Sequence, residues 1–248
     1  MSKKVLITAG TTAFMIDQVR IIYPSSTMDS AEIKNIFHGT TGALIAKYFA
    51  RQGDQVTLAT SGEMISGNGN VRIIPFTTFQ GLETIMETEI QNGSYDVVIH
   101  SAAVADFMPD KVFGRTENGQ LVEIDSSKKI SSKNPELFLR FVPTPKLIDR
   151  IREPWGFKGI LVKFKLEVGI SDENLIKIAQ KSLTHSKADF IVANCLEWAD
   201  ERAYIIEKSG QLSNTARYFL PAELYRTTWK MLEGMKGETI PCAYGEKK

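Results

Sequence analysis

Short segments that are apolar on both faces alternate, along the first hundred residues, with longer segments of helical periodicity. The helical spacing is clearest in the recurrence of Leu44, Ile45, Tyr48 and Phe49. We expect strands over Lys4–Thr8, Gln55–Thr60, Val71–Pro75 and Asp96–His100, and helices over Thr40–Arg51 and Phe79–Gln91. Strands without a polar face are typical of parallel sheets that are covered on both sides. The pattern therefore predicts an α/β fold, with a Rossmann-like parallel sheet and helices on both faces.

Residues 111–142 interrupt this pattern with polar, glycine-containing sequence. We interpret Leu121–Asp125 and Glu136–Val142 as extended pieces of a β excursion that leaves the sheet and forms a flap. Beyond it, we expect helices over Lys146–Arg152, Asp172–Ser186 (N-capped by Asp172) and Pro221–Met235, strands over Gly159–Phe164 and Asp189–Ala193, and an antiparallel edge strand over Ala203–Glu207. Residues 1–248 are thus interpreted as one domain that carries a flap at 111–142.

The composition argues against several broad classes of protein. The 248 residues are 43% hydrophobic, which is enough for a buried core. Lys plus Arg total 30 and Asp plus Glu total 29, so a net charge of +1 gives no general attraction to nucleic acid or anionic membranes. Cys195 and Cys242 are the only cysteines, and no apolar run approaches ~20 residues. We expect a cytoplasmic protein that has small-molecule ligands, no nucleic-acid or membrane partner, and no signal peptide.

Several familiar catalytic motifs are missing from the sequence. It contains no GxxxxGKS or GxxxxGKT P-loop, and no GxGxxG follows the first strand. HExxH and GxSxG are also absent, and His38, His100 and His185 are scattered along the chain. A short-chain NAD(P) oxidoreductase is disfavoured because no TGxxxGxG occurs. A ligand-binding site has to be sought elsewhere, at the ends of the predicted strands.

The carboxyl ends of the first and fourth strands combine small residues with polar ones, and such strand ends are where α/β sheets hold ligands. Gly10 and Thr11 follow the first strand, although an ordinary βα turn explains these residues equally well. Ser101 and Ala102 follow the fourth strand and leave space ahead of Asp106, unless they only pack under a helix. The Asp106 carboxylate is suited to accept hydrogen bonds from a base or a sugar, or to help hold a metal ion.

The segment Asn35–Gly42 leads into the first long helix. Backbone N–H groups at a helix start, together with the hydroxyls of Thr40 and Thr41, suit a phosphate or a carboxylate. Gly39 permits close approach of such a group. Plain N-capping is an alternative with equal weight.

Two basic segments complete the candidate site. Ser126–Lys133 places three lysines among four serines on the flap, where they would reach over phosphates or form a solvated loop. Leu161–Glu167 alternates Lys163 and Lys165 with apolar residues at the end of a strand. Lysines at the end of a strand are often only solvated surface residues, but these two point at the same sheet edge as Asp106.

Taken in order, these segments resemble the phosphopantothenate–cysteine ligase family. The motifs that match are AGTT (Ala9–Thr12), VR (Val19, Arg20), Asn35, FHGTTG (Phe37–Gly42), AAVADF (Ala102–Phe107), KI (Lys129, Ile130), KFKLEV (Lys163–Val168) and IVANCLE (Ile191–Glu197). Some positions depart from the family. Thr11 replaces the second glycine of GGT, Ser132 stands where bacterial members have a lysine, and Cys195 replaces an aspartate.

The resemblance implies a ligase of coenzyme A biosynthesis that works in two steps. A nucleoside triphosphate with Mg²⁺ activates the carboxylate of 4'-phosphopantothenate as an acyl-nucleotidylate and releases pyrophosphate. The amine of cysteine then displaces the nucleotide and forms an amide. Two anions have to meet in this reaction, so lysines, a metal ion and a helix start are needed to offset their repulsion.

The resemblance also implies roles for particular residues. Asn35 and Lys129 are expected to act in catalysis, and Asn35, Gly39, Thr40 and Thr41 to bind phosphopantothenate. The residues expected to bind the nucleotide are Gly10, Thr11, Ser101, Ala102, Asp106, Lys133, Lys146, Phe164, Lys165 and Lys181. No residue is assigned to the metal.

The resemblance further implies a homodimer whose site is closed by the flap around Lys129–Lys133. The matches at FKLE, ANCLE and KISS follow the eukaryotic pattern, which favours ATP over CTP as the co-substrate. The departures from the family motifs leave one alternative from another class. It is a non-catalytic, Rossmann-like nucleotide-binding module that regulates a partner.

Overall fold

The structure is a computed structural model that describes residues 2–22, 38–62 and 71–236. Its strands are β1 (Lys4–Ala9), β2 (Phe14–Met15), β3 (Ile21–Ile22), β4 (Gln55–Thr60), β5 (Val71–Pro75), β6 (Val97–His100), β7 (Phe107–Arg115), β8 (Leu121–Ile124), β9 (Leu137–Pro143), β10 (Ile160–Glu167), β11 (Phe190–Cys195), β12 (Arg202–Glu207) and β13 (Leu212–Ala216). Its helices are α2 (Thr40–Arg51), α3 (Phe79–Asn92), α4 (Leu147–Arg150), α5 (Asp172–His185) and α6 (Leu220–Lys236), with 3₁₀ turns η1 (Leu196–Trp198) and η2 (Arg217–Phe219).

The main sheet has eight strands in the order β13-β12-β11-β10-β6-β1-β4-β5. The six strands from β11 to β5 are parallel, whereas β12 pairs antiparallel with both of its neighbours, β11 and β13. The chain first builds outward from β1 through β4 to β5, and then returns to place β6 on the other side of β1. This reversal makes the carboxyl ends of β1 and β6 the switch point of the sheet, where ligands bind in open α/β folds.

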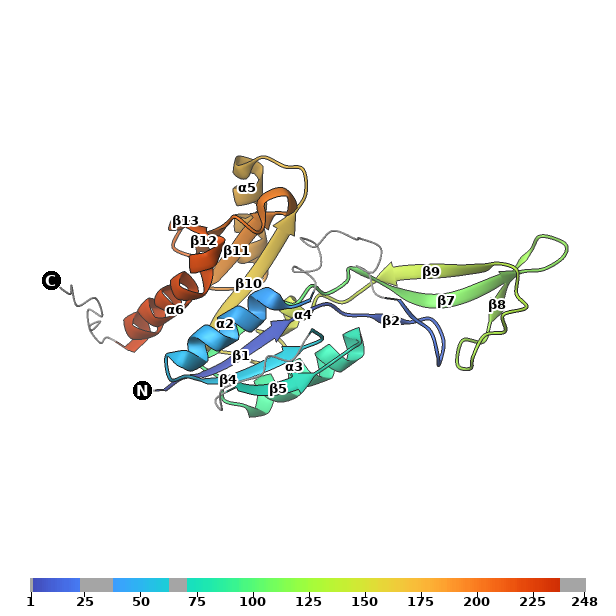
Figure 1. The fold of residues 1–248 in the computed structure, drawn as a ribbon, viewed down its shortest axis with the longest axis horizontal. Coiled ribbons are helices and arrows are strands. Elements are labelled where there is room, and N and C mark those ends of the chain that lie inside the picture. The colour runs from blue at the N-terminus through green and yellow to red at the C-terminus, as the bar shows by residue number, and fades with distance from the viewer. Residues whose placement is uncertain (1, 23–37, 63–70, 237–248) are drawn as a thin grey trace.

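Helices cover both faces of this sheet, as predicted (Figure 1). On one face, α2 and α6 lie side by side, and Phe49 and Leu224 are buried against β1, β6 and β10. On the other face, α3, α4 and α5 bury Leu82, Leu147 and Leu175 in a second apolar cluster. Because the strands are buried on both sides, their apolar character has a direct structural cause. Among the described residues, no helix has the length and apolar character needed to cross a bilayer.

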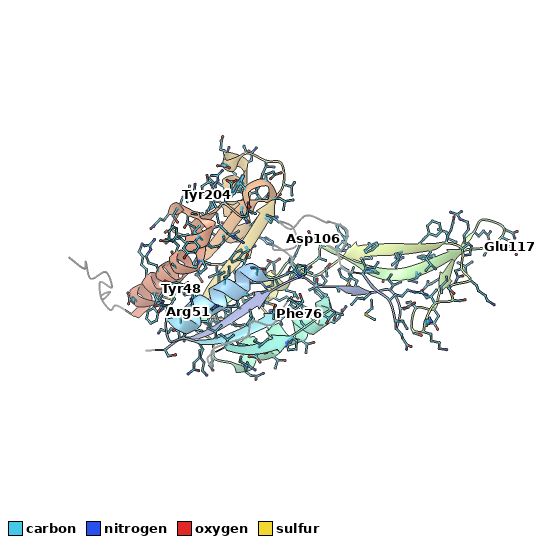
Figure 2. The ribbon with its side chains drawn as sticks, in the orientation of Figure 1. Tyr48, Arg51, Phe76, Asp106, Glu117 and Tyr204 are labelled. Atoms are coloured by element: carbon cyan, nitrogen blue, oxygen red, sulfur yellow. The ribbon has the colours of Figure 1, made fainter. Side chains whose placement is uncertain are left out.

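The predicted excursion is a separate three-stranded antiparallel sheet in the order β8-β7-β9, which we call the flap (residues 107–143). It projects away from the main body (Figure 1), and Glu117 lies at its far end (Figure 2). It begins at Phe107, earlier than the predicted residue 111, because Phe107 already pairs with Pro143. The first strand of the flap therefore starts immediately after Asp106.

Two predictions about the second half of the chain are wrong in detail. The N-cap of α5 is Ser171, whose hydroxyl accepts the Asn174 N–H, while the carboxylate of Asp172 binds Arg202 instead. The strand β12 is antiparallel as expected, but β13 pairs outside it and forms the edge. The sequence of β13, LSNTA, is polar because an exposed edge strand needs few apolar residues, and hydrophobic periodicity therefore did not predict this strand.

Candidate active site

A row of three polar side chains crosses the centre of the sheet at the carboxyl ends of its strands. Thr8 of β1, His100 of β6 and Lys163 of β10 are neighbours in register, and all three are buried. The hydroxyl of Thr8 lies 2.8 Å from His100 Nδ1. The ammonium of Lys163 donates to Ser182 Oγ at 2.8 Å. Polar groups are thus concentrated at the switch point of an otherwise apolar sheet.

A cleft of about 370 Å³ opens above this row. Its walls are the loop after β6, the start of α4 and the end of β10, and its floor includes His100 and Lys163. Five of the residues predicted to bind nucleotide line it, namely Ala102, Asp106, Lys146, Phe164 and Lys165. The structure therefore brings together, from three separate segments, half of the ten residues predicted for that role.

Asp106 lies at the rim of the cleft, where the flap leaves the main body (Figure 2). Its carboxylate forms an ion pair with Lys146 Nζ, and both side chains are exposed. The Asp106 backbone is fixed because its carbonyl accepts the Thr144 N–H at 2.8 Å, while the Thr144 hydroxyl donates to Ala105 O at 2.7 Å. An exposed ion pair contributes little stability, so a ligand can replace either partner at low cost.

The floor of the cleft carries two basic residues, Lys163 from the basic segment expected at this sheet edge and His100, which motif comparison did not assign to the site. Burial, with a contribution from Lys163, lowers the pKa of His100 to about 4, so the imidazole is neutral. Burial lowers the pKa of Lys163 to about 8, although Asp149 acts in the opposite direction. The signal for Lys163 was present in the sequence, because a lysine inside the apolar run LVKF is placed where burial is expected, and lysines are rarely buried without a specific partner.

The start of α2 packs directly against the ends of β1 and β6. Gly39 has φ of 79° and precedes the helix without a side-chain cap. A Cβ on Gly39 would lie 2.7 Å from Gly10 N, and one on Gly42 would lie 2.8 Å from Ser101 Oγ. Only glycine fits at these two positions, and the contact places Gly10, Ser101 and Thr41 around one helix start. No acidic side chain occupies the first turn, which leaves its N–H groups available to an anion.

Thr11 has its polar groups bound within the protein. Its N–H donates to Ser61 Oγ at 2.8 Å, and its hydroxyl donates to Ala103 O at 3.2 Å. It therefore joins the loop after β1 to the loop after β6, and only 8% of its surface is exposed.

The remaining predicted residues lie outside the cleft. Lys129 and Lys133 are exposed on the loop between β8 and β9, and Lys181 is exposed on α5, one residue before the cleft residue Ser182. Thr40 is exposed at the start of α2. Asn35 lies outside the residues that the structure describes.

Lys129 precedes Ile130, whose backbone is held against the β2–β3 hairpin by a buried clamp. The carboxylate of Asp17, between β2 and β3, accepts the Ile130 N–H at 3.0 Å and an N–H of Arg20 Nη1 at 3.0 Å. Arg20 Nη2 in turn donates to Ile130 O at 3.0 Å. Burial works to raise the pKa of Asp17, but backbone N–H donors and Arg20 outweigh it and hold that pKa below its usual value. This clamp fixes the flap loop to the β2–β3 hairpin.

Arg217 is another residue that motif comparison did not find. It opens η2, and its Nη2 donates to Thr41 Oγ1 in the first turn of α2. Its Nη1 is buried and has no hydrogen-bond partner among the described residues. Burial lowers the pKa of the guanidinium, against the opposing field of Asp200. The helix start is therefore flanked by a cation that comes from the other end of the chain.

Comparison with known proteins supports one family. The sequence pattern of the "DNA/pantothenate metabolism flavoprotein C-terminal domain" matches residues 1–214. A coenzyme A biosynthesis bifunctional protein CoaBC from Thermococcus kodakarensis is 33% identical over 236 residues, which cover 94% of this chain and 51% of that protein. The chain thus spans about half the length of that relative, and 47% of the corresponding protein from Borreliella burgdorferi.

Solved structures agree with this assignment. The DNA/pantothenate metabolism flavoprotein from Streptococcus pneumoniae superposes with a TM-score of 0.76 at 28% identity, covering 93% of this chain and 100% of that one. A Cab2 variant in complex with phosphopantothenate-cysteine superposes with a TM-score of 0.66 at 17% identity, covering 94% and 89%, and shows a shared fold. The chain belongs to the family of DNA/pantothenate metabolism flavoprotein C-terminal domains.

Proposed function

We propose that this chain is a phosphopantothenate–cysteine ligase of coenzyme A biosynthesis that acts in the cytoplasm. The observation that carries the proposal is the cleft at the switch point, where the AAVADF loop meets Lys146, Lys163 and Lys165 beside the start of α2. The names of the relatives, CoaBC and the Saccharomyces cerevisiae phosphopantothenate–cysteine ligase CAB2, support the same activity.

In the first step, a carboxylate oxygen of phosphopantothenate attacks the α-phosphorus of the nucleotide, and the bond to pyrophosphate breaks. In the second step, the cysteine amine attacks the acyl carbon, the nucleoside monophosphate leaves, and the amine loses a proton. The lysines around the cleft would offset the repulsion between carboxylate and triphosphate. The Ala102 backbone and the Asp106 carboxylate would bind the base and sugar, with Phe164 packing nearby.

The phosphate of phosphopantothenate would bind at the start of α2. Free N–H groups of the first turn and the hydroxyls of Thr40 and Thr41 are the donors for it. Gly39 allows the close approach, and Asn35 would contact the acyl intermediate. Lys129, on the clamped loop of the flap, would reach the nucleotide phosphates from above.

The described residues fit a Mg²⁺ that arrives with the triphosphate. Within them, no group of three or more metal-binding side chains lies together. Mg²⁺ typically binds through substrate phosphates and one or two carboxylates, so such a group is not required. When bound, the ion would neutralise charge on the departing pyrophosphate.

We propose ATP as the preferred nucleotide over CTP, on the eukaryotic pattern of the KFKLEV and IVANCLE motifs. We also propose a homodimer. The flap exposes several apolar side chains, and soluble monomers rarely expose such a group together. These side chains are Phe107, Leu121, Val122 and Phe141.

The test is an assay of pyrophosphate release with phosphopantothenate, cysteine, Mg²⁺ and either ATP or CTP. The proposal requires release that depends on phosphopantothenate, with ATP the faster substrate. The alternative, a non-catalytic nucleotide-binding module that regulates a partner, predicts nucleotide binding without any pyrophosphate release. A CTP preference above tenfold would contradict only the nucleotide assignment.

A further inference from the structure

The position of Arg217 is determined by the fold on both sides of it. Its backbone N–H donates to Glu201 O at 2.7 Å, which ties the start of η2 to the turn before β12. The helix α6 that follows is anchored by Leu220 and Leu224, which are both buried. The side chain is therefore held at the start of α2, although 176 residues separate it from Thr41 in the sequence.

The guanidinium lacks the partner that its charge requires. Buried charges in proteins are normally paired with an opposite charge and fully hydrogen-bonded. Arg217 donates to one neutral hydroxyl, its Nη1 is buried without a partner among the described residues, and none of the described carboxylates forms an ion pair with it. Among the described residues, this partly buried guanidinium therefore has no anion in contact with it, although the charge of Asp200 acts on it from farther away.

The groups around Arg217 are donors as well. The first intrahelical bond of this turn runs from Ala43 N to Gly39 O, so the N–H groups of the preceding residues have no intrahelical acceptor. Thr41 Oγ1 accepts from Arg217, which leaves its own hydrogen free to be donated elsewhere. A fork of guanidinium donors, a hydroxyl and a helix start match the oxygens of a phosphate dianion.

We propose that Arg217 binds the phosphate of the acyl substrate, and that this contact lets the protein distinguish phosphopantothenate from pantothenate. The inference rests on the proposed function. It goes beyond it because Arg217 follows residue 214, where the match to the family pattern ends. Neither the flap nor the nucleotide cleft is involved, so the contact should affect the acyl substrate alone.

The test compares Arg217→Met and Arg217→Lys with a control, Arg226→Met. Arg226 is an exposed arginine on α6 that pairs with Glu223 at 2.7 Å, so the control removes a guanidinium remote from the start of α2. The measurements are calorimetric binding of phosphopantothenate and of pantothenate, and KM for both acyl substrate and nucleotide. For Arg217→Met we expect affinity for phosphopantothenate to fall roughly 10- to 100-fold, the factor that hydrogen bonds to charged groups are worth. Affinity for pantothenate and KM for the nucleotide should be unchanged.

Arg217→Lys keeps the charge without the fork, so it should show a smaller loss that is still specific to the phosphorylated ligand. Arg226→Met should resemble the wild type. Equal losses for phosphopantothenate and pantothenate would mean that Arg217 only supports the structure, and unchanged affinities would also overturn the inference. If Arg217→Met does not fold, the Lys variant decides by the same comparison. Wild-type protein that binds phosphopantothenate without turnover contradicts the proposed function and not this inference, whereas absence of binding contradicts both.

Discussion

Lys163 combines a charge with burial, and this combination has a consequence for stability. Its pKa is lowered to about 8 in the folded protein, against about 10.5 in an unfolded chain. Between these values the unfolded state binds more protons, so the free energy of unfolding rises with pH across that window. Below pH 8 the folded protein bears the full cost of the buried ammonium.

We predict that Lys163→Met abolishes this rise. Relative to the variant, the wild type should gain on the order of 2 kcal/mol between pH 8 and 10.5, less than the full pKa difference implies because solvent reaches the cleft. Chemical denaturation at several pH values measures it. Lys177→Met, an exposed lysine on α5, is the matched control. Parallel pH profiles for the wild type and Lys163→Met would contradict the account.

Asp106 lies in an exposed ion pair, so its replacement should affect substrate binding more than the free energy of unfolding. We predict that Asp106→Asn raises KM for the nucleotide by roughly 5- to 150-fold, since an unmet polar group in a binding site costs ~1–3 kcal/mol. KM for phosphopantothenate should change much less. The unfolding free energy should move by about 1 kcal/mol at most. A larger effect on KM for phosphopantothenate than on KM for the nucleotide would contradict the assignment of Asp106 to the nucleotide.

The flap and the β2–β3 hairpin are two elements joined by the Asp17 clamp. We predict that Asp17→Asn frees the loop around Ile130 and lowers kcat, because Lys129 loses its fixed position. Hydrogen exchange at residues 129–131 should become faster while the strands of the main sheet keep their protection. Asp125→Asn on the same flap, where the carboxylate accepts the N–H of the nearby Ser127, serves as the control. Unchanged exchange in Asp17→Asn would show that the clamp does not order the loop.

The elements that the sequence predicted well are those whose burial is uniform. The strands β1, β4 and β6 are apolar on both faces because helices cover both, and periodicity reports that directly. The edge strand β13 was missed because exposure removes the apolar signal. The flap was recognised as an excursion, but its start was placed at residue 111 and its first strand, β7, was not predicted. Phe107 and Met108 resemble the end of a loop until their pairing with β9 is known.

The same contrast holds for the site. Motif matching located Asp106 and Phe164 because neighbouring residues in the chain identify them. Arg217 and His100 are defined by contacts across the fold, with partners 176 and 92 residues away, and no local pattern announces such contacts. Composition and spacing therefore identify the strand ends that form the site. The charged residues that reach the site from distant elements can be identified only from the structure.

At the scale of the whole molecule, the flap should be an interface between two copies of the chain. We predict a dimer at micromolar concentration, and we predict that Leu121→Glu dissociates it, because the charge falls on an exposed apolar strand of the flap. Met235→Glu, an exposed apolar position on α6, should leave the dimer intact. Sedimentation velocity measures both. A wild-type monomer with full activity would contradict this prediction.

The central claim is that the protein makes an acyl-nucleotidylate from phosphopantothenate before cysteine enters the reaction. The most direct test omits cysteine and examines the protein-bound products by mass spectrometry after incubation with ATP, Mg²⁺ and phosphopantothenate. The account predicts a phosphopantothenoyl-adenylate together with pyrophosphate, and its conversion to the amide when cysteine is added. Bound nucleotide that remains an intact triphosphate, with CTP as well as with ATP, would contradict it.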